Sequence, residues 1–205
     1  MLKRIFLTVL FIALVFSRSG LADTEFWSVN IIQFSLREKV KLNIIPELRF
    51  RNNASELYYF RTYFGPTLLL SKNFDLSVYY ALNYSKTGTN WAQSNLAYLD
   101  GTYKIDFPWF DFTNCGRFEY DISPDILKYR NLFQFKREGW ILSDELFCNF
   151  KLGFFDEGRS LVAYAIKFPG KIDLLIGYLL RRQRSSTTAD WTRTNVINLG
   201  LRVDL

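Results

Sequence analysis

Hydrophobic and polar side chains alternate strictly at the end of the chain. From Ile197 to Leu205 every second residue is aliphatic, and the residues between them are Asn198, Gly200, Arg202 and Asp204. Because successive side chains of a strand point to opposite faces, a period of two over this length predicts a half-buried β-strand.

The same kind of pattern recurs along the chain as paired runs. Short turn segments begin at Arg37, Ser71, Phe107, Arg137 and Phe168, at intervals of 34, 36, 30 and 31 residues. Each turn is followed by a strand-like run, a polar loop and a returning run, which together form a hairpin. The ten runs are Val40–Arg51, Leu57–Leu70, Leu76–Ser85, Trp91–Ile105, Phe110–Tyr120, Leu127–Lys136, Trp140–Lys151, Arg159–Lys167, Lys171–Arg181 and Trp191–Leu205.

The length of these runs favours strands that cross a membrane. Most have nine to fifteen residues, whereas strands of soluble proteins usually have about five or six. A tilted membrane-crossing strand needs about nine to eleven. A soluble periplasmic sandwich would show the same alternation with its apolar face inward, and it is kept as an alternative. Strand length, abundant aromatics and the export signal described below together predict an all-β fold, an antiparallel transmembrane β-barrel of the outer-membrane type.

The number of strands has two possible values. Five hairpins make ten strands, but Phe26–Leu36 is an eleventh strand-like segment in which Ile31 and Ile32 interrupt the alternation. Bacterial single-chain barrels have an even number of strands. We therefore expect ten strands, with this segment inside the barrel or along its rim; twelve strands would require one more that the pattern does not reveal.

The first 22 residues have the features of an export signal. Lys3 and Arg4 precede the apolar run Ile5–Phe16, which is too short for a membrane helix, and Gly20 and Ala22 supply small residues for cleavage. An uncleaved N-terminal anchor is the alternative. Cleavage would remove three cations and no acid, so the formal charge would fall from +6 to +3. Residues 23–205 are then the barrel domain, and no compact basic run indicates a nucleic-acid partner.

The last residues also resemble an assembly signal. The pattern Asn198-x-Gly200-x-x-Val203-x-Leu205 is similar to the C-terminal signal that the bacterial barrel-assembly machinery recognises, although an aromatic is commoner than leucine at the last position. The resemblance implies a Gram-negative outer-membrane protein with this machinery as its partner during biogenesis. The tight turns would then be periplasmic and the longer loops external. Expected partners are outer-membrane lipid and lipopolysaccharide, and a monomer is expected. If the barrel does not transport solutes, its outer loops, notably Arg181–Arg184, would contact lipopolysaccharide phosphates or a partner.

The composition argues against catalysis and metal binding. The chain has no histidine and two cysteines, which excludes a Ser-His-acid hydrolase, imidazole metal ligands and a structural zinc site made of cysteines alone. No acidic run has calcium-loop spacing. We therefore expect no enzyme, cofactor or metal. Cys115 and Cys148 are predicted on opposite faces of strands that are not neighbours, so two free thiols are expected.

Charged side chains are predicted to gather inside the barrel. This lumen set is Lys41, Glu47, Arg49, Arg51, Arg61, Arg117, Glu119, Lys128, Arg130 and Glu145, with Lys136, Lys167, Asp173 and Arg181 on the same face of their strands. One interpretation is a narrow, cation-lined pore for small anionic solutes. The other is a non-transport barrel, structural or surface-interacting, whose arginine–carboxylate pairs fill the interior. Because barrels near eight strands are filled by side chains, the small diameter favours filling.

Several short blocks resemble a known family. They are Phe26-Trp27, Ser55–Thr62, Tyr129-Arg130-Asn131, Leu142–Phe147 and Asp190–Val196, and in this order they are similar to the domain of unknown function 2490 family, exported bacterial proteins expected to be outer-membrane barrels. The resemblance covers nearly all of the chain after the export signal and implies a fold and a location, but no activity. The polar positions of its motifs correspond to Glu56, Arg61, Arg130, Asp144, Glu145, Asp190 and Trp191.

Overall fold

The structure is a computed structural model that describes residues 24–122, 125–184 and 190–205. The export signal predicted at residues 1–22 lies outside the described residues. Within them the chain forms eleven β-strands, and no helix there is long and apolar enough to cross a membrane. The strands are β1 (Thr24–Arg37), β2 (Val40–Arg51), β3 (Glu56–Leu69), β4 (Phe74–Thr87), β5 (Asn90–Asp106), β6 (Asp111–Asp121), β7 (Ile126–Arg137), β8 (Trp140–Asn149), β9 (Phe154–Phe168), β10 (Ile172–Arg184) and β11 (Trp191–Asp204).

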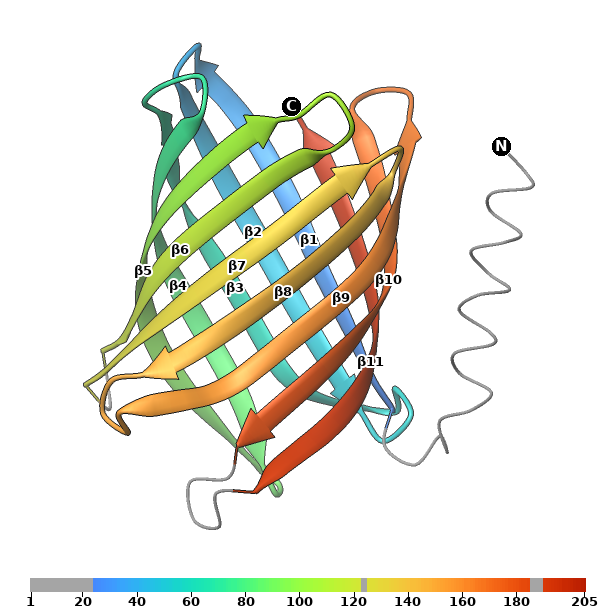
Figure 1. The fold of residues 1–205 in the computed structure, drawn as a ribbon. Helices are drawn as coiled ribbons and strands as arrows, with labels where there is room; N and C mark the ends of the chain where they lie inside the picture. Colours follow the sequence, from blue (N-terminus) through green and yellow to red (C-terminus); the bar gives the residue numbers. More distant parts are fainter. Residues whose placement is uncertain (1–23, 123–124, 185–189) are drawn as a thin grey trace.

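The strands close into a single barrel in chain order (Figure 1). Each strand is antiparallel to the next, and β1 pairs with β11 in parallel, with Thr24 aligned to Asn195 and Gln33 to Asp204. An odd number of strands that alternate in direction requires one parallel pair in a closed ring. Backbone bonds complete this seam at its end: the Ser35 amide donates to the Leu205 carbonyl (3.1 Å) and the Leu205 amide to the Gln33 carbonyl (2.8 Å).

The strand count corrects the prediction from the sequence. The described residues form eleven strands rather than ten or twelve, and Phe26–Leu36 is part of the wall as β1 instead of lying inside or along the rim. Val29 and Ile31 pack inward against an apolar cluster around Ile45 and Tyr63, so Ile32 is the outward residue of an ordinary alternation. The pattern seemed broken because the apolar residues are inward up to Ile31 and outward from Ile32, while the outward residues Ser28 and Asn30 are polar.

The two ends of the barrel differ. The end that carries Leu205 also carries the β1–β2, β3–β4, β5–β6, β7–β8 and β9–β10 connections, and we call it the turn end. The opposite end, the loop end, carries the other connections and Thr24. The five turns predicted from the sequence all lie at the turn end. The polar loop expected between the runs Trp140–Lys151 and Arg159–Lys167 included Phe154–Gly158, but these residues form the beginning of β9.

The outward face is apolar and exposed on most strands. Large hydrophobic side chains stand on the outside from β3 to β8 and again on β11, and these include Phe64, Val78, Leu99, Phe118, Phe133, Leu142 and Leu201. The inward positions between them are largely polar or charged, for example Glu47, Arg61, Asp100 and Arg117, which are all buried. Glu47 on β2 and Arg117 on β6 therefore lie on the inward faces that the alternation assigned to them.

Gly65 is a position where the wall has no room for a side chain. A Cβ atom built there would lie 1.9 Å from the Val78 carbonyl oxygen of the neighbouring strand. Gly65→Ala is expected to lower the free energy of unfolding by about 1–3 kcal/mol, because the backbones of β3 and β4 would have to separate. Urea unfolding in lipid vesicles measures the loss. Gly101→Ala is the control, since its Cβ would be 3.5 Å from the Phe74 ring; equal losses would contradict the explanation.

Candidate functional site

A buried carboxylate holds two arginines on one side of the interior. Glu47 and Arg49 are two residues apart on β2 and share its inward face, and Arg61 is directly opposite Glu47 on β3. Arg49 Nε donates to Glu47 Oε1 (2.6 Å), and Arg61 donates to Oε2 through both Nε (3.1 Å) and Nη2 (2.5 Å). All three side chains are at most 7% exposed. These contacts are arginine–carboxylate pairs of the kind that the second interpretation of the lumen set describes.

The same cluster continues into β5 and β6 through an aromatic layer. Arg61 Nη1 donates to the Tyr98 hydroxyl (2.8 Å). Next to it, Arg117 makes a two-point contact with Asp100, its cross-strand partner, from Nε to Oδ1 (2.6 Å) and from Nη2 to Oδ2 (2.5 Å). The Arg117 guanidinium lies 4.7 Å from the centre of the Tyr98 ring. Planar guanidinium groups bound to carboxylates and stacked on aromatic rings are held rigidly.

A second cluster lies on the other side of the interior. Glu145 on β8 pairs with Arg130 on β7 (2.9 Å) and with Arg159 on β9 (3.4 Å). Glu157 on β9 pairs with the same Arg159 (2.5 Å) and with Arg181 on β10 (3.1 Å). These side chains are 11–15% exposed, so this half of the network is also largely shielded from solvent.

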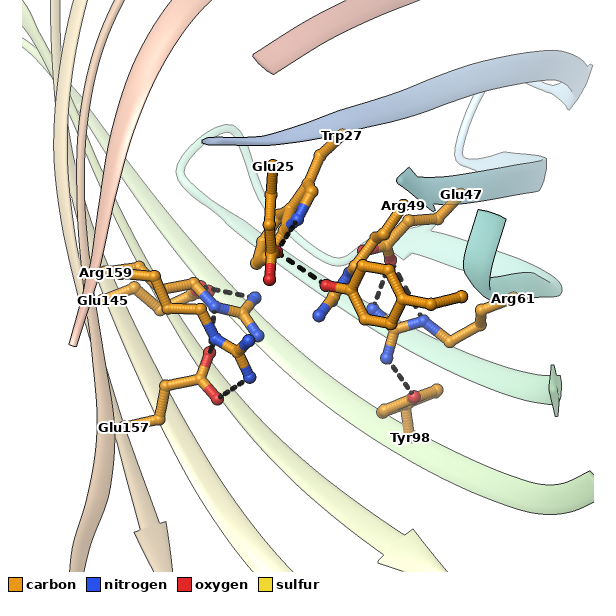
Figure 2. Close-up of polar contacts among 11 residues, drawn as sticks. Glu25, Trp27, Glu47, Arg49, Arg61, Tyr98, Glu145, Glu157 and Arg159 are labelled. Atoms are coloured by element: carbon orange, nitrogen blue, oxygen red, sulfur yellow. Dashed lines mark hydrogen bonds and ion pairs between the residues drawn. The ribbon is translucent and has the colours of Figure 1, made fainter. Parts of the chain in front are cut away.

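Trp27 joins the two clusters. It is 2% exposed, and its ring centre lies 3.8 Å from the Arg49 guanidinium and 5.0 Å from that of Arg159. Figure 2 shows Trp27 and Glu25 between the Glu47 group and the Arg159 group. Trp27 Nε1 donates to Glu25 Oε2 (2.7 Å), which also accepts from the Tyr58 hydroxyl (2.6 Å). Together these contacts form one network, here called the lumen network, that reaches from β2 across the interior to β10.

The remaining predicted lumen residues lie nearer the two ends of the barrel. Lys41 donates to Gln33 Oε1 (3.2 Å) towards the turn end. Arg51 pairs with Glu56 (3.0 Å) at the loop end, where Lys86 also contacts Glu56 (2.9 Å). Glu119 and Lys128 face each other directly in the β6–β7 register. The ten predicted residues are thus distributed over the whole height of the interior, and Glu47, Arg49, Arg61, Arg130 and Glu145 belong to the lumen network.

Sequence reasoning missed several members of the network and also Asp100, whose pair with Arg117 lies beside it. Trp27 and Glu25 were missed because β1 had no assigned place, and Glu157 because it was assigned to a loop. Arg159 and Asp100 lay within predicted strands. Each is two residues from a side chain that faces the interior, Arg159 from Leu161 and Asp100 from Tyr98. Extending the inward parity of those strands would have included both, so the signal was present in the alternation.

Neither a disulfide nor a metal-binding cluster is present among the described residues. Cys115 and Cys148 are both free, as predicted. Among the described residues, no group of three or more histidine, cysteine or acidic side chains is arranged to hold a metal ion.

The residues of the predicted assembly signal lie at the seam between β1 and β11. Gly200 approaches β1 there so closely that a Cβ atom would be 3.0 Å from the Val29 carbonyl oxygen.

Comparison with known proteins gives one match. The model of a family described as "Protein of unknown function (DUF2490)" matches residues 24–193. No curated protein and no solved structure matches the chain.

Proposed function

The chain belongs to the family described as protein of unknown function (DUF2490), and we propose that it is an integral outer-membrane β-barrel whose interior is closed to solutes by its own ion-paired side chains. On this proposal the protein acts as a structural or surface-interacting element of the membrane rather than as a channel.

The membrane location is supported by the way the wall satisfies its backbone. A closed ring of strands has no free edge, which is the condition for β-structure in hydrocarbon, where water is absent. Its strands have 10–17 residues, enough for a tilted crossing. Large apolar side chains are exposed on the outside, a surface that a soluble protein would have to cover.

The closed interior is supported by one observation, the lumen network. Glu47, Trp27 and Arg159 connect opposite walls through contacts of side chains that are buried or nearly so. Arginines that already have carboxylate partners cannot bind a passing anion without breaking a pair, and a broken buried pair is costly. The interior is therefore expected to resist both water and ions.

A narrow pore for small anions is the second candidate. It is favoured by the composition of the lumen network and its Arg117–Asp100 neighbour, in which six arginines (49, 61, 117, 130, 159 and 181) face five acids (25, 47, 100, 145 and 157). An excess of cations would attract anions if a continuous water path existed beside the pairs.

Fractionation and gel mobility test the membrane proposal. The chain is expected in the outer-membrane fraction, and it should migrate faster on a detergent gel before heating than after boiling, because a closed barrel resists detergent until it is heated. A soluble β-sandwich of the same composition would appear in the periplasmic fraction with one mobility, and that result would refute the proposal.

Planar-bilayer recordings separate a closed barrel from a narrow pore. The wild-type protein is expected to show no discrete current steps, whereas Trp27→Ala should show them, because the ring that joins the two halves of the network is removed. Both proteins must first show the heat-dependent gel shift. Anion-selective steps from the wild type would favour the pore instead.

A further inference from the structure

The outward residues change from apolar to polar and cationic near the loop end of β9, β10 and β11. On β10 the outward residues from the turn end are Ile172, Leu174, Ile176, Tyr178 and Leu180, and the next is Arg182. On β11 the corresponding apolar run ends at Ile197 and is followed by Asn195 and Arg193. Arg182 and Arg193 are directly opposite each other in the β10–β11 register. Two arginines therefore lie side by side where the apolar surface ends, towards the loop end.

The height of this limit matches the edge of a bilayer. Ile172 to Leu180 covers about 27 Å of strand at about 3.4 Å per residue, or about 20 Å of depth at a tilt of about 40–45°. Arg182 is one outward position further on, close to the edge of an apolar band about 25 Å tall. Lipid phosphates lie just beyond that edge.

Arg182 is held in place by its neighbours on the outside of the barrel. Its Nη2 atom donates to Ser160 Oγ (3.2 Å) and lies 3.6 Å from Asp144 Oδ1. Ser160 Oγ in turn donates to Asp144 Oδ1 (2.5 Å). The side chain of Arg182 remains 42% exposed, so a further acceptor can reach it. Arg181, the preceding residue, points inward to Glu157 and takes no part in this surface.

The surface around Arg182 and Arg193 carries more positive than negative charge. Arg193 is exposed, whereas the Arg184 guanidinium lies 4.4 Å from the centre of the Phe154 ring, opposite the buried Asn149, and does not belong to this surface. In the described part of the chain, Asp144 is the one carboxylate that pairs with either arginine. Unneutralised guanidinium groups at the edge of an apolar surface favour a phosphorylated ligand, because phosphate accepts two parallel hydrogen bonds from arginine.

We propose that Arg182 and Arg193, here called the arginine patch, bind the phosphates of lipopolysaccharide in the outer leaflet. The inference rests on the proposed outer-membrane location with the loop end outward. Lipopolysaccharide is chosen over a phospholipid because the patch lies at the loop end, and over free phosphate because the adjoining wall is apolar and would contact acyl chains.

Binding of lipopolysaccharide to the purified barrel in detergent tests the patch. The probe is lipopolysaccharide, added at increasing concentrations. At each concentration the temperature at which half of the protein loses its fast gel mobility is measured. Phosphatidylglycerol and inorganic phosphate are added in separate series. The double variant Arg182→Gln/Arg193→Gln should weaken lipopolysaccharide binding at least tenfold. Arg37→Gln, at an exposed position of the turn end, should change it less than twofold. Asp144→Asn should strengthen binding, because it removes the carboxylate that competes for Arg182.

The outcomes separate this inference from the proposed function. Equal binding by the double variant and the wild type, both still showing the gel shift, would overturn the arginine patch and leave the barrel proposal intact. Equally tight binding of phosphatidylglycerol, or stabilisation by inorganic phosphate alone, would overturn the assignment to lipopolysaccharide. A wild-type chain without a gel shift would refute the membrane barrel itself.

Discussion

Glu47→Gln is expected to lower the free energy of unfolding by roughly 3–5 kcal/mol, the cost of leaving a buried charge without its partner. The amide keeps the size of the side chain, but Arg49 and Arg61 both lose the negative charge that balances them. Their side chains are 6% and 7% exposed, so water cannot replace the carboxylate. Reversible urea unfolding in lipid vesicles, followed by tryptophan fluorescence, measures the loss.

Glu56→Gln provides a matched control for this substitution. Glu56 also contacts two cations, Arg51 and Lys86, but it is 25% exposed at the loop end. Exposed ion pairs contribute about 1 kcal/mol or less, so this variant should be nearly as stable as the wild type. If Glu47→Gln cost no more than Glu56→Gln, the centre of the barrel would be hydrated and the narrow pore would become the better explanation.

Ile176→Arg is expected to lower the stability of the folded barrel in lipid by roughly 2–4 kcal/mol, the range for arginine on the lipid face near the bilayer midplane. Ile176 is the middle residue of the outward apolar run of β10. Its replacement would place a guanidinium group in hydrocarbon with no carboxylate beside it. Equilibrium unfolding in vesicles measures the change.

Leu36→Arg tests whether depth in the membrane causes this effect. Leu36 is outward on β1 close to the turn end and is 60% exposed, so an arginine there should cost about 0–1 kcal/mol, as near an interface. Both substitutions exchange an aliphatic residue for arginine on an outward position. Similar small losses at both sites would mean that the outer wall is in water, which contradicts the membrane location.

The alternation of side chains was sufficient to predict most of the wall. Val40–Arg51 was predicted with the bounds that β2 has, and the inward positions of Glu47, Arg49 and Arg61 followed from its parity and that of β3. This success has a physical basis. The two faces of a strand have different surroundings, so hydrophobic and polar residues alternate in the sequence with a period of two.

The place of β1 could not be predicted in the same way. Its inward face is apolar at Trp27, Val29 and Ile31, whereas its outward face is polar at Ser28 and Asn30 and apolar at Ile32 and Phe34. The alternation therefore changes phase between Ile31 and Ile32, which conceals a single strand. The even strand count expected of bacterial barrels then pointed away from the correct answer. A parallel pair between the first and last strands leaves no local signal, because it joins residues about 170 positions apart.

The contacts across the interior were also beyond local reasoning. Glu47 and Arg61 are cross-strand neighbours in one hairpin, and their pairing was predictable from the register. Trp27 meets both Arg49 and Arg159 only because the ring closes with a particular diameter. That diameter depends on the number of strands and their stagger, so an error in strand count removes these contacts from any prediction.

If the barrel spans a membrane as proposed, its eleven strands cross that membrane an odd number of times, so its two ends lie on opposite sides as they do in a single-pass protein. The wall begins at the loop end with Thr24 and finishes at the turn end with Leu205. Under the proposed orientation these two ends lie in different compartments, with Thr24 at the cell surface and Leu205 in the periplasm. Assembly must then carry the leading end of β1 through the membrane, a step that a barrel made only of hairpins avoids.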